Sequence, residues 1–263
     1  RAAKSGEFFN YHPHRSLANN SVCYTEHPDM GIFLKEWESL YESKSGERGI
    51  FNIEAARVDT DRRDTSLIKG TNPCSEILLR DRQFCNLTEV IVRPEDTEAD
   101  LTRKIRLATI LGTFQAMLTQ FKFLSRKWKD NCEQERLLGV SLTGIMDHPS
   151  LGSSQADVYR RLKEEVVNTN KAWAAKVGIE QATATTCVKP SGTVSQLCDT
   201  SSGIHPRYSA YYIRRVRQDI KDPVTQVLIN AGIPWEVDVT NAQAMVFSFP
   251  MKAPRESVMR NDM

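Results

Sequence analysis

The most informative stretch of this sequence is Thr71-Asn72-Pro73-Cys74-Ser75-Glu76-Ile77. Pro73 cannot occupy a helix interior and biases Asn72 toward an extended backbone. Because residues two apart in an extended segment point the same way, we expect Asn72, Cys74 and Glu76 to project together. This trio suits a site where sulfur reacts with a polyhydroxylated substrate while a carboxylate moves a proton. From spacing alone, a surface loop with an inert, buried cysteine is the simpler interpretation.

A second stretch, Lys189-Pro190-Ser191-Gly192-Thr193, has the residues of an anion-binding turn. Gly192 lets the backbone approach an anion closely, and N–H groups at the start of a helix favour negative charge. The hydroxyls of Ser191, Thr193 and Ser195 add donors. Pro-Ser-Gly-Thr is also a common turn, so turn chemistry alone does not separate phosphate binding from a simple chain reversal. The lysine that opens the stretch either adds charge or is solvated.

Composition argues against several classes of protein. The 263 residues carry 35 Lys and Arg against 33 Asp and Glu, a net charge of +2, which disfavours a protein that coats nucleic acid. No run approaches the ~20 apolar residues of a membrane span and no signal segment opens the chain, so we expect a cytoplasmic protein without a membrane partner. Six cysteines without a CxxC pair and five histidines provide no zinc framework, so we expect no metal site. The chain has no initiator Met, and we expect it to be an internal piece of a longer protein.

Hydrophobic periodicity predicts alternating strands and helices. Helices are expected over residues 32–41, 100–124, 154–177, 193–197 and 222–231, the third with Ser153 or Ser154 as its N-cap. Strands are expected over residues 48–53, 89–92, 137–145, 183–188, 211–216 and 244–249, and residues 57–70 are expected to be loop. Strand-then-helix alternation of this kind implies an α/β layer or barrel.

Three motifs, in order along the chain, resemble those of the ribonucleotide reductases. Asn72-Pro73-Cys74-Ser75-Glu76-Ile77 resembles the radical-cysteine loop, Phe84-Cys85-Asn86-Leu87-Thr88 resembles the segment of the second redox cysteine, and the stretch 189–193 resembles the substrate-phosphate loop. Further stretches that resemble the family are Ser202-Gly203-Ile204-His205-Pro206, Ala18-Asn19-Asn20-Ser21-Val22 and Arg48-Gly49-Ile50-Phe51-Asn52. The short separation of Cys74 from Cys85 resembles the class II, adenosylcobalamin-dependent branch rather than the iron-dependent class I branch.

The resemblance implies an α/β fold in which residues 1–263 form part of a ten-stranded barrel around a central radical-cysteine finger loop, with the N- and C-terminal parts absent. It implies radical-based reduction of ribonucleoside tri- or diphosphates to 2′-deoxyribonucleotides for DNA synthesis, with adenosylcobalamin as cofactor. It also implies a thioredoxin-type reductant, deoxynucleotide or ATP effectors, and no nucleic-acid partner. Because only one cysteine of the family's redox pair is matched, we expect the chain alone to be inactive.

The resemblance also implies residue roles. Cys74 would become a thiyl radical that takes hydrogen from the ribose C3′, Glu76 would act as general base on the 3′-hydroxyl, and Asn72 would hydrogen-bond the substrate hydroxyls. Cys85 would supply one of the two thiols that reduce the 2′ position. The residues implied in phosphate binding are Pro190, Ser191, Gly192, Thr193, Val194 and Ser195. The neighbourhood of the loop that communicates effector identity would contain Arg15, Asn19 and Asn20.

Two other interpretations remain open at this point. The chain could belong to a class I large subunit with a separate radical-generating subunit, against which the spacing of Cys74 and Cys85 argues. It could also be a catalytically silent nucleotide-binding module that keeps the barrel, against which the intact trio of Asn72, Cys74 and Glu76 argues. Cys187 matches no motif and is expected to lie in the core of its strand.

Overall fold

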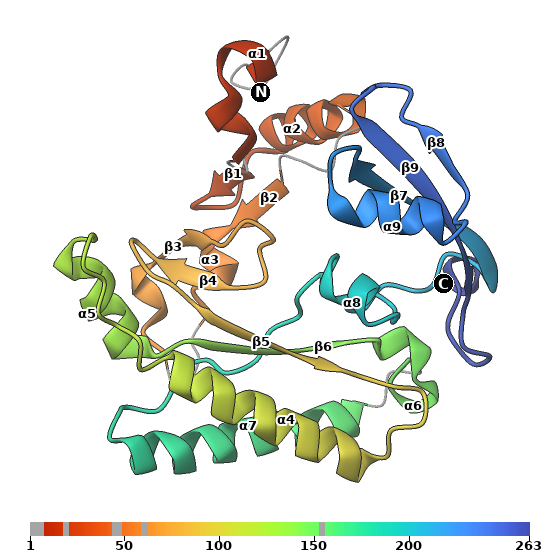
Figure 1. Cartoon of the computed structure of the whole chain (residues 1–263). Coiled ribbons are helices and arrows are strands. Elements are labelled where there is room, and N and C mark those ends of the chain that lie inside the picture. Colours follow the sequence, from red (N-terminus) through yellow and green to blue (C-terminus); the bar gives the residue numbers. More distant parts are fainter. Residues whose placement is uncertain (1–7, 18–20, 44–48, 59–62, 153–155) are drawn as a thin grey trace. The chain divides into compact units, whose positions relative to one another are not determined.

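The computed structural model describes residues 8–17, 21–43, 49–58, 63–152 and 156–263 (Figure 1). The chain forms two compact units. Unit 1 comprises residues 1–90, 102–141 and 161–189, and unit 2 comprises residues 91–101, 142–160 and 190–263. Each unit joins segments that are far apart in the sequence, so contacts between distant segments define both units.

The first two strands of unit 1 are parallel. β1 (Ser21–Tyr24) pairs with β2 (Gly49–Asn52), which continues directly into α3 (Ile53–Ala56). The Asn52 side chain accepts a hydrogen bond from the Ala55 N–H at 3.0 Å and so caps this helix. The helices before and between the two strands are α1 (Phe8–Tyr11), η2 (Pro13–Leu17) and α2 (Met30–Ser43).

The expected helix over residues 32–41 is confirmed by α2, and the expected strand over residues 48–53 is confirmed by β2. The apolar face of α2 is open rather than buried, since Ile32, Trp37 and Tyr41 are exposed. The expected strand is also less buried than its composition indicates, because Gly49 and Asn52 are exposed.

A hairpin follows, built from β3 (Ile68–Thr71) and β4 (Leu78–Arg80), which pair antiparallel. The prediction of loop over residues 57–70 is therefore wrong in part, because η3 (Thr65–Leu67) and most of β3 lie in this range. The reason is that pairing with β4 and the complete burial of Ile68 outweigh a polar composition that disfavours a strand.

A parallel arrangement surrounds β6 (Leu138–Thr143). On one side lies β5 (Asn86–Ile91), whose Asn86 N–H donates to the Leu137 carbonyl at 3.2 Å. On the other side, the Leu138 N–H donates to the Ala184 carbonyl at 3.0 Å and the Cys187 N–H donates to the Val140 carbonyl at 3.2 Å. The strands expected over residues 89–92 and 137–145 thus run side by side. The prediction of a strand over residues 183–188 is wrong, because this segment makes only an isolated parallel bridge, between Thr186 and Val140.

Three further helices are α4 (Glu98–Gln115), α5 (Arg126–Glu135) and α7 (Ala156–Val177). In unit 1, α4 and α7 lie side by side, and Asn170 Nδ2 donates to Thr113 Oγ1 at 3.0 Å (Figure 1). The helix expected over residues 100–124 ends nine residues early, because the chain turns after Gln115 and Thr119 bonds Glu133 of α5 at 2.7 Å. The expected N-caps of α7, Ser153 and Ser154, lie outside the described residues.

Unit 2 contains an antiparallel sheet in which β9 (Ala244–Lys252) lies between β7 (Tyr211–Asp219) and β8 (Trp235–Val237). α9 (Pro223–Asn230) follows β7, and its N-cap Asp222 accepts a hydrogen bond from the Val224 N–H at 2.8 Å. Shorter elements are η4 (Ile145–Asp147), α6 (Pro149–Gly152), α8 (Val194–Leu197) and η5 (Arg260–Asp262). The helices and strands expected over residues 193–197, 211–216, 222–231 and 244–249 are confirmed.

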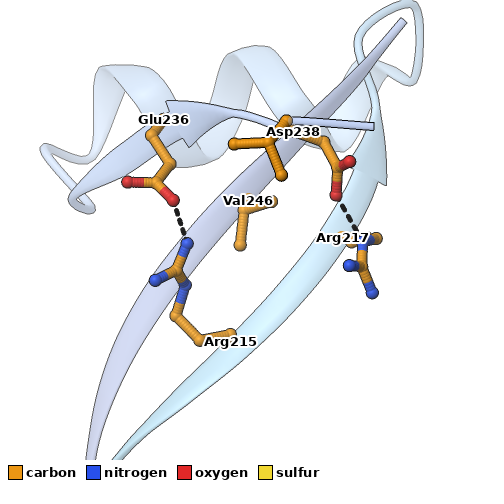
Figure 2. Close-up of a pocket in the computed structure, with 6 residues that line it drawn as sticks. Arg215, Arg217, Glu236, Asp238 and Val246 are labelled. Carbon is orange, nitrogen blue, oxygen red and sulfur yellow. Dashed lines mark hydrogen bonds and ion pairs between the residues drawn. The ribbon is translucent and has the colours of Figure 1, made fainter. Parts of the chain in front are cut away.

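Two ion pairs cross β9 on one face of this sheet. Arg215 pairs with Glu236 and Arg217 pairs with Asp238, with Val246 between the two pairs (Figure 2). A cavity of about 220 Å³ lies among these side chains. Arg215 and Arg217 therefore each face a carboxylate across the sheet.

The expected α/β class is confirmed. Within the described residues, the strands form three two-stranded sheets and one three-stranded sheet. Across the same residues, no helix has the length and apolar character needed to cross a membrane.

Candidate active site

Cys74 lies in a tight loop between β3 and β4 rather than in an extended run. The Asn72 N–H donates to the Ile77 carbonyl at 3.1 Å, and the Ile77 N–H donates to Asn72 Oδ1 at 3.0 Å. Ser75 has a φ of 64°, in the left-handed region. The prediction that Asn72, Cys74 and Glu76 alternate along an extended backbone is therefore wrong, because the Asn72 side chain closes the loop.

The thiol and the carboxylate of this loop differ in solvent exposure. Cys74 is exposed, whereas the Glu76 side chain is only 2% exposed. Neither carboxylate oxygen of Glu76 has a hydrogen-bond partner among the described residues. A buried carboxylate with open lone pairs is costly unless a charge compensates it, and it is well suited to accept a proton from a ligand.

The compensating charge comes from Lys189. Its Nζ lies 3.9 Å from Glu76 Oε1, and its backbone N–H donates to Ser141 Oγ of β6 at 3.0 Å. The lysine side chain is 31% exposed, so its ammonium group reaches water as well as the buried carboxylate. Of the two roles that the sequence left open for Lys189, the structure favours added charge.

Two thiols share this part of unit 1. Cys85 directly precedes β5, and Cys187 lies on the far side of β6. Burial, followed by the negative charge of Glu76, raises the pKa of Cys85. Burial, followed by the charges of Glu76 and Cys85, raises the pKa of Cys187 from 9.0 to about 12. Both groups are therefore protonated thiols at neutral pH, and neither forms a disulfide.

Gly139 of β6 provides the space that these side chains occupy. A Cβ at this position would lie 2.5 Å from Leu87 Cδ2, 3.0 Å from Cys187 Sγ and 3.2 Å from Ile77 Cδ1. Sequence reasoning missed both Gly139 and the proximity of Cys187 to the site. The only available signal was the strand pattern over residues 137–145 and 183–188, which does not say which strands pair.

In unit 2, the implied phosphate segment reverses the chain before α8. Ser191 has a φ of 51°, its side chain is buried, and its Oγ has no hydrogen-bond partner among the described residues. Gly192, Thr193 and Val194 are exposed. The Ser195 hydroxyl is fully buried and donates to the Ser191 carbonyl. The Ser195 hydroxyl thus holds the turn together in this structure, and its part in phosphate binding stays a prediction.

A cavity of about 460 Å³ lies beside this segment within unit 2. It is lined by Pro190, Gly192, Gln196, Thr200, Ser201, Ser202, His205, Pro206, Arg207, Tyr208 and Tyr212. Its volume is within the range of ordinary small-molecule sites. The wall of the cavity therefore contains Pro190 and Gly192 of the implied phosphate segment.

Arg207 in the lining of the cavity belongs to a buried ion pair with Asp147. Asp147 is 1% exposed and accepts two hydrogen bonds from Arg207, from Nε and from Nη2, both at 2.9 Å. It also accepts from the Ser201 N–H at 2.8 Å and from Ser257 Oγ at 3.0 Å. Burial alone would raise the pKa of Asp147, but the bonds from Arg207 and Ser201 outweigh it and hold the pKa below its ordinary value.

The implied effector neighbourhood is only partly described. Arg15 lies in η2, where its N–H donates to the His12 carbonyl at 2.9 Å. Asn19 and Asn20 lie outside the described residues. No group of His, Cys, Asp and Glu side chains within the described part of the chain is arranged to hold a metal ion.

Comparison with known proteins relates this geometry to a family. No protein-family model matches the chain. The chain is 30% identical to the adenosylcobalamin-dependent ribonucleoside-triphosphate reductase of Lacticaseibacillus paracasei and 26% identical to that of Lactobacillus acidophilus. Each match covers 92% of this chain and 36% of the relative.

Solved structures agree. A crystal structure of a B12-dependent, class II ribonucleotide reductase matches 98% of this chain and 40% of that chain, with a TM-score of 0.75 and 24% identity. The class Id ribonucleotide reductase alpha subunit of Actinobacillus ureae matches 81% of this chain and 47% of that chain, with a TM-score of 0.52 and 20% identity.

The fold is therefore that of a ribonucleotide reductase. In sequence and fold, the chain is a relative of the class II, adenosylcobalamin-dependent reductases, and it spans 36% of the length of the curated relatives above. Class II is favoured over class I because both curated relatives named above are adenosylcobalamin-dependent.

Proposed function

We propose that this chain carries the radical cysteine, one redox thiol and the phosphate-binding segment of a class II ribonucleotide reductase, which reduces ribonucleotides to 2′-deoxyribonucleotides for DNA synthesis. The observation that carries the proposal is the ion pair between Glu76 and Lys189, whose carboxylate acts on the nearby Cys85. Glu76 lies on the same loop as the exposed Cys74. The chain thus has a thiol open to solvent, a buried base and a protonated reductant within unit 1.

The reaction assigns each of these groups a step. The Cys74 sulfur, as a radical, takes the hydrogen atom from C3′ and later returns it, while Glu76 accepts the proton of the 3′-hydroxyl. Replacing the 2′-hydroxyl by hydrogen releases water and takes two electrons and two protons. Two thiols supply these and close as a disulfide, and Cys85 is one of them. Its raised pKa suits this role because the protonated thiol carries the proton as well as the electron.

Phosphate recognition is assigned to residues 190–195 of unit 2. The strained Ser191 backbone, its unpaired hydroxyl and the exposed Gly192 and Thr193 support this assignment. Lys189, which pairs with Glu76, directly precedes Pro190 of this segment in the sequence. We assign to Arg15, Asn19 and Asn20 the neighbourhood that senses effector identity.

Adenosylcobalamin fits this site because the Cys74 thiol is exposed and so is accessible to a radical-generating cofactor. When bound, the cofactor would supply the radical that Cys74 carries. The proposed partners are a ribonucleoside tri- or diphosphate, a deoxynucleotide or ATP effector, and a thioredoxin-type reductant. We place the activity in the cytoplasm, where free thiols stay reduced.

A product assay on the full-length protein tests the proposal. With adenosylcobalamin, a dithiol and a ribonucleoside triphosphate, Cys74→Ser should abolish deoxynucleotide formation and leave nucleotide binding unchanged. Cys198→Ser is the matched control and should keep full turnover. Wild-type turnover by Cys74→Ser would contradict the proposal, and binding of nucleotide without any product from the wild type would favour a silent nucleotide-binding module.

The phosphate assignment has its own test by isothermal titration. Ser191→Ala and Thr193→Ala should each weaken nucleotide binding by ~1–2 kcal/mol, the value of a hydrogen bond to a charged group. Unchanged affinity of the double variant would mean that residues 190–195 form only a turn.

A further inference from the structure

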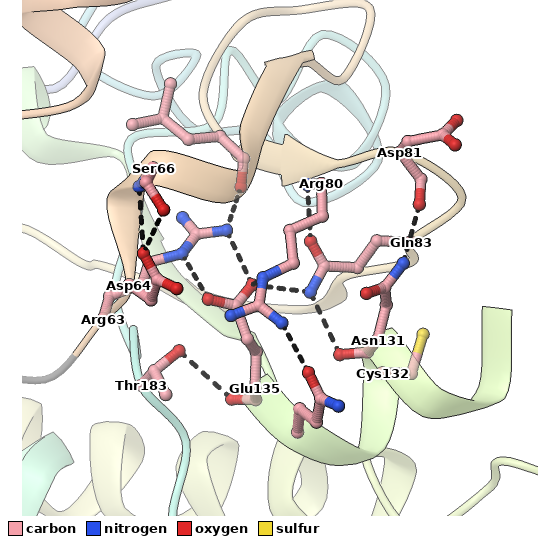
Figure 3. Close-up of polar contacts among 12 residues, drawn as sticks. Arg63, Asp64, Ser66, Arg80, Asp81, Gln83, Asn131, Cys132, Glu135 and Thr183 are labelled. Atoms are coloured by element: carbon pink, nitrogen blue, oxygen red, sulfur yellow. Dashed lines mark hydrogen bonds and ion pairs between the residues drawn. The ribbon is translucent and has the colours of Figure 1, made fainter. Parts of the chain in front are cut away.

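The last turn of α5 lies against the segment that joins the Cys74 loop to Cys85 (Figure 3). Glu135 is the centre of this contact and is only 1% exposed. We propose that Glu135 is a positioning residue that fixes the Cys74 loop and Cys85 relative to each other. This inference rests on the proposed function for the importance of those two thiols, while the contacts that support it do not depend on that function.

One set of contacts leads from Glu135 to the Cys74 loop. Arg63 donates to Glu135 Oε1 from Nε at 2.8 Å and to Oε2 from Nη2 at 2.9 Å. The same Nη2 donates to the Leu78 carbonyl at 2.8 Å. Leu78 is the first residue of β4 and follows Glu76 by two positions, so the carboxylate of Glu135 holds the end of the loop through Arg63.

A second set leads to Cys85. Gln83 Nε2 donates to Glu135 Oε2 at 2.6 Å, and Gln83 Oε1 accepts the Arg80 N–H at 2.8 Å. One helical turn earlier in α5, Cys132 Sγ accepts the Phe84 N–H at 3.3 Å. The two residues before Cys85 are therefore both bonded to α5.

A third contact leads to the segment that carries Cys187 and Lys189. The Glu135 backbone carbonyl accepts the Thr183 N–H at 2.9 Å. Glu135 thus bonds directly or through one residue to three segments, and each segment carries site residues a few positions further on. The side chain makes the first two sets of contacts and the backbone makes the third, and a side chain that served only the packing of α5 would not need polar contacts to both the Cys74 loop and the segment before Cys85.

The charges explain why the carboxylate matters. Arg63 and Arg80 are 7% and 8% exposed, and Arg80 Nε lies 3.4 Å from Glu135 Oε2. Two buried guanidinium groups therefore face one carboxylate. Removing its charge leaves both cations uncompensated, and the loops they hold must then rearrange.

The test measures the protection of Cys85 in the full-length protein without cofactor. Iodoacetamide labels the thiols, and mass spectrometry follows the labelling rate of the Cys85 peptide. Glu135→Gln should raise this rate about tenfold, because local opening becomes easier when charge-assisted bonds are lost. Glu165→Gln is the matched control in unit 1. It also removes a carboxylate charge that faces an arginine, Arg106, at 2.8 Å, but Glu165 is far in sequence from the thiol loops. It should leave the rate unchanged.

A second variant covers the case in which Glu135→Gln does not fold. Gln83→Met keeps the length of the side chain and removes only its bonds to Glu135 and the neighbouring backbone. It should also raise the labelling rate of Cys85. In folded protein, an unchanged rate in both variants would overturn the inference.

Turnover supplies a further readout. The Glu135→Gln enzyme should lose kcat while KM for the nucleotide stays the same, because the phosphate segment lies in unit 2. A loss of kcat/KM that came from a raised KM, with kcat unchanged, would contradict a positioning role. If the proposed function is wrong, Cys74→Ser will not show the expected loss of deoxynucleotide, while Glu135→Gln will still raise the labelling rate of Cys85. The two failures are therefore distinguishable.

Discussion

Lys189 Nζ lies 3.9 Å from Oε1 of Glu76, a carboxylate that is 2% exposed and has no hydrogen-bond partner among the described residues. The Glu76 charge is therefore held in the protein by a cation rather than by a network of donors. This leaves the lone pairs of the carboxylate open to a substrate hydroxyl, as a general base requires.

Replacing Lys189 by Met should destabilise unit 1 by about 1–2 kcal/mol in urea unfolding. This is less than the 3–5 kcal/mol of a fully buried pair, because the lysine is 31% exposed and water screens part of the interaction. Lys129→Met is the matched control, because Lys129 also lies 3.9 Å from its partner, Glu133, but both side chains are more exposed. Equal losses of unfolding free energy in the two variants would show that Lys189 does not stabilise the buried Glu76 carboxylate.

The raised pKa of Cys187 predicts a pH dependence of stability. The folded state holds the thiol proton up to a pKa of about 12, and the unfolded state releases it near 9.0. The contribution is therefore complete below pH 9.0 and is lost as pH rises toward 12. The free energy of unfolding, measured from pH 8 upward, should fall more steeply for the wild type than for Cys187→Ser. Parallel curves would mean that the thiol titrates alike in both states.

Gly139→Ala should cost about 1–3 kcal/mol, the usual range for overpacking a core. The new Cβ would meet Leu87, Cys187 and Ile77 at 2.5, 3.0 and 3.2 Å, and all three side chains would have to move. Gly70→Ala serves as the control, because a Cβ there meets nothing within 4 Å. Thermal unfolding of both variants measures the difference, and an equal Tm would refute the close approach.

Asp147→Asn should destabilise unit 2 by about 3 kcal/mol, because it leaves the buried Arg207 with only the exposed Asp199 as a counter-charge. Asp157→Asn, which removes an exposed pair with Arg160, should change stability by less than about 0.5 kcal/mol. The folded-state pKa of Asp147 is lowered, so its contribution is present above the ordinary carboxylate value of ~4 and is lost as pH falls below it. The difference in unfolding free energy between wild type and Asp147→Asn should therefore become smaller in acid. A difference that does not change with pH would contradict the ion pair.

Local sequence proposed residues for the site but not the structure that supports them. Cys74, Glu76 and Cys85 were proposed because they lie in short, distinctive motifs. Cys187 and Gly139 reach the site only through the pairing of distant strands, which periodicity does not specify. The geometry of the Cys74 loop also differed from its prediction, because the bond from the Ile77 N–H to the Asn72 side chain curls a backbone that Pro73 alone would leave extended.

The same limit applies to secondary structure. α5 was missed because Arg126–Glu135 consists almost entirely of charged and polar residues, so only Trp128 and Cys132 mark an apolar face. α5 supports the site through the polar contacts of Glu135 and Asn131 with the segment before Cys85. Those contacts exist only in the folded chain. The strand over residues 244–249 was predicted correctly because its four residues Ala244–Phe247 form a continuous buried run.

The central claim is that Cys74 takes and returns the hydrogen atom of the ribose C3′. The most direct test compares deoxynucleotide formation by the full-length protein from ribonucleoside triphosphates carrying hydrogen or deuterium at C3′. The account predicts slower reduction of the deuterated substrate by the wild type and no product from Cys74→Ser with either one. Product formation by Cys74→Ser at the wild-type rate would contradict it.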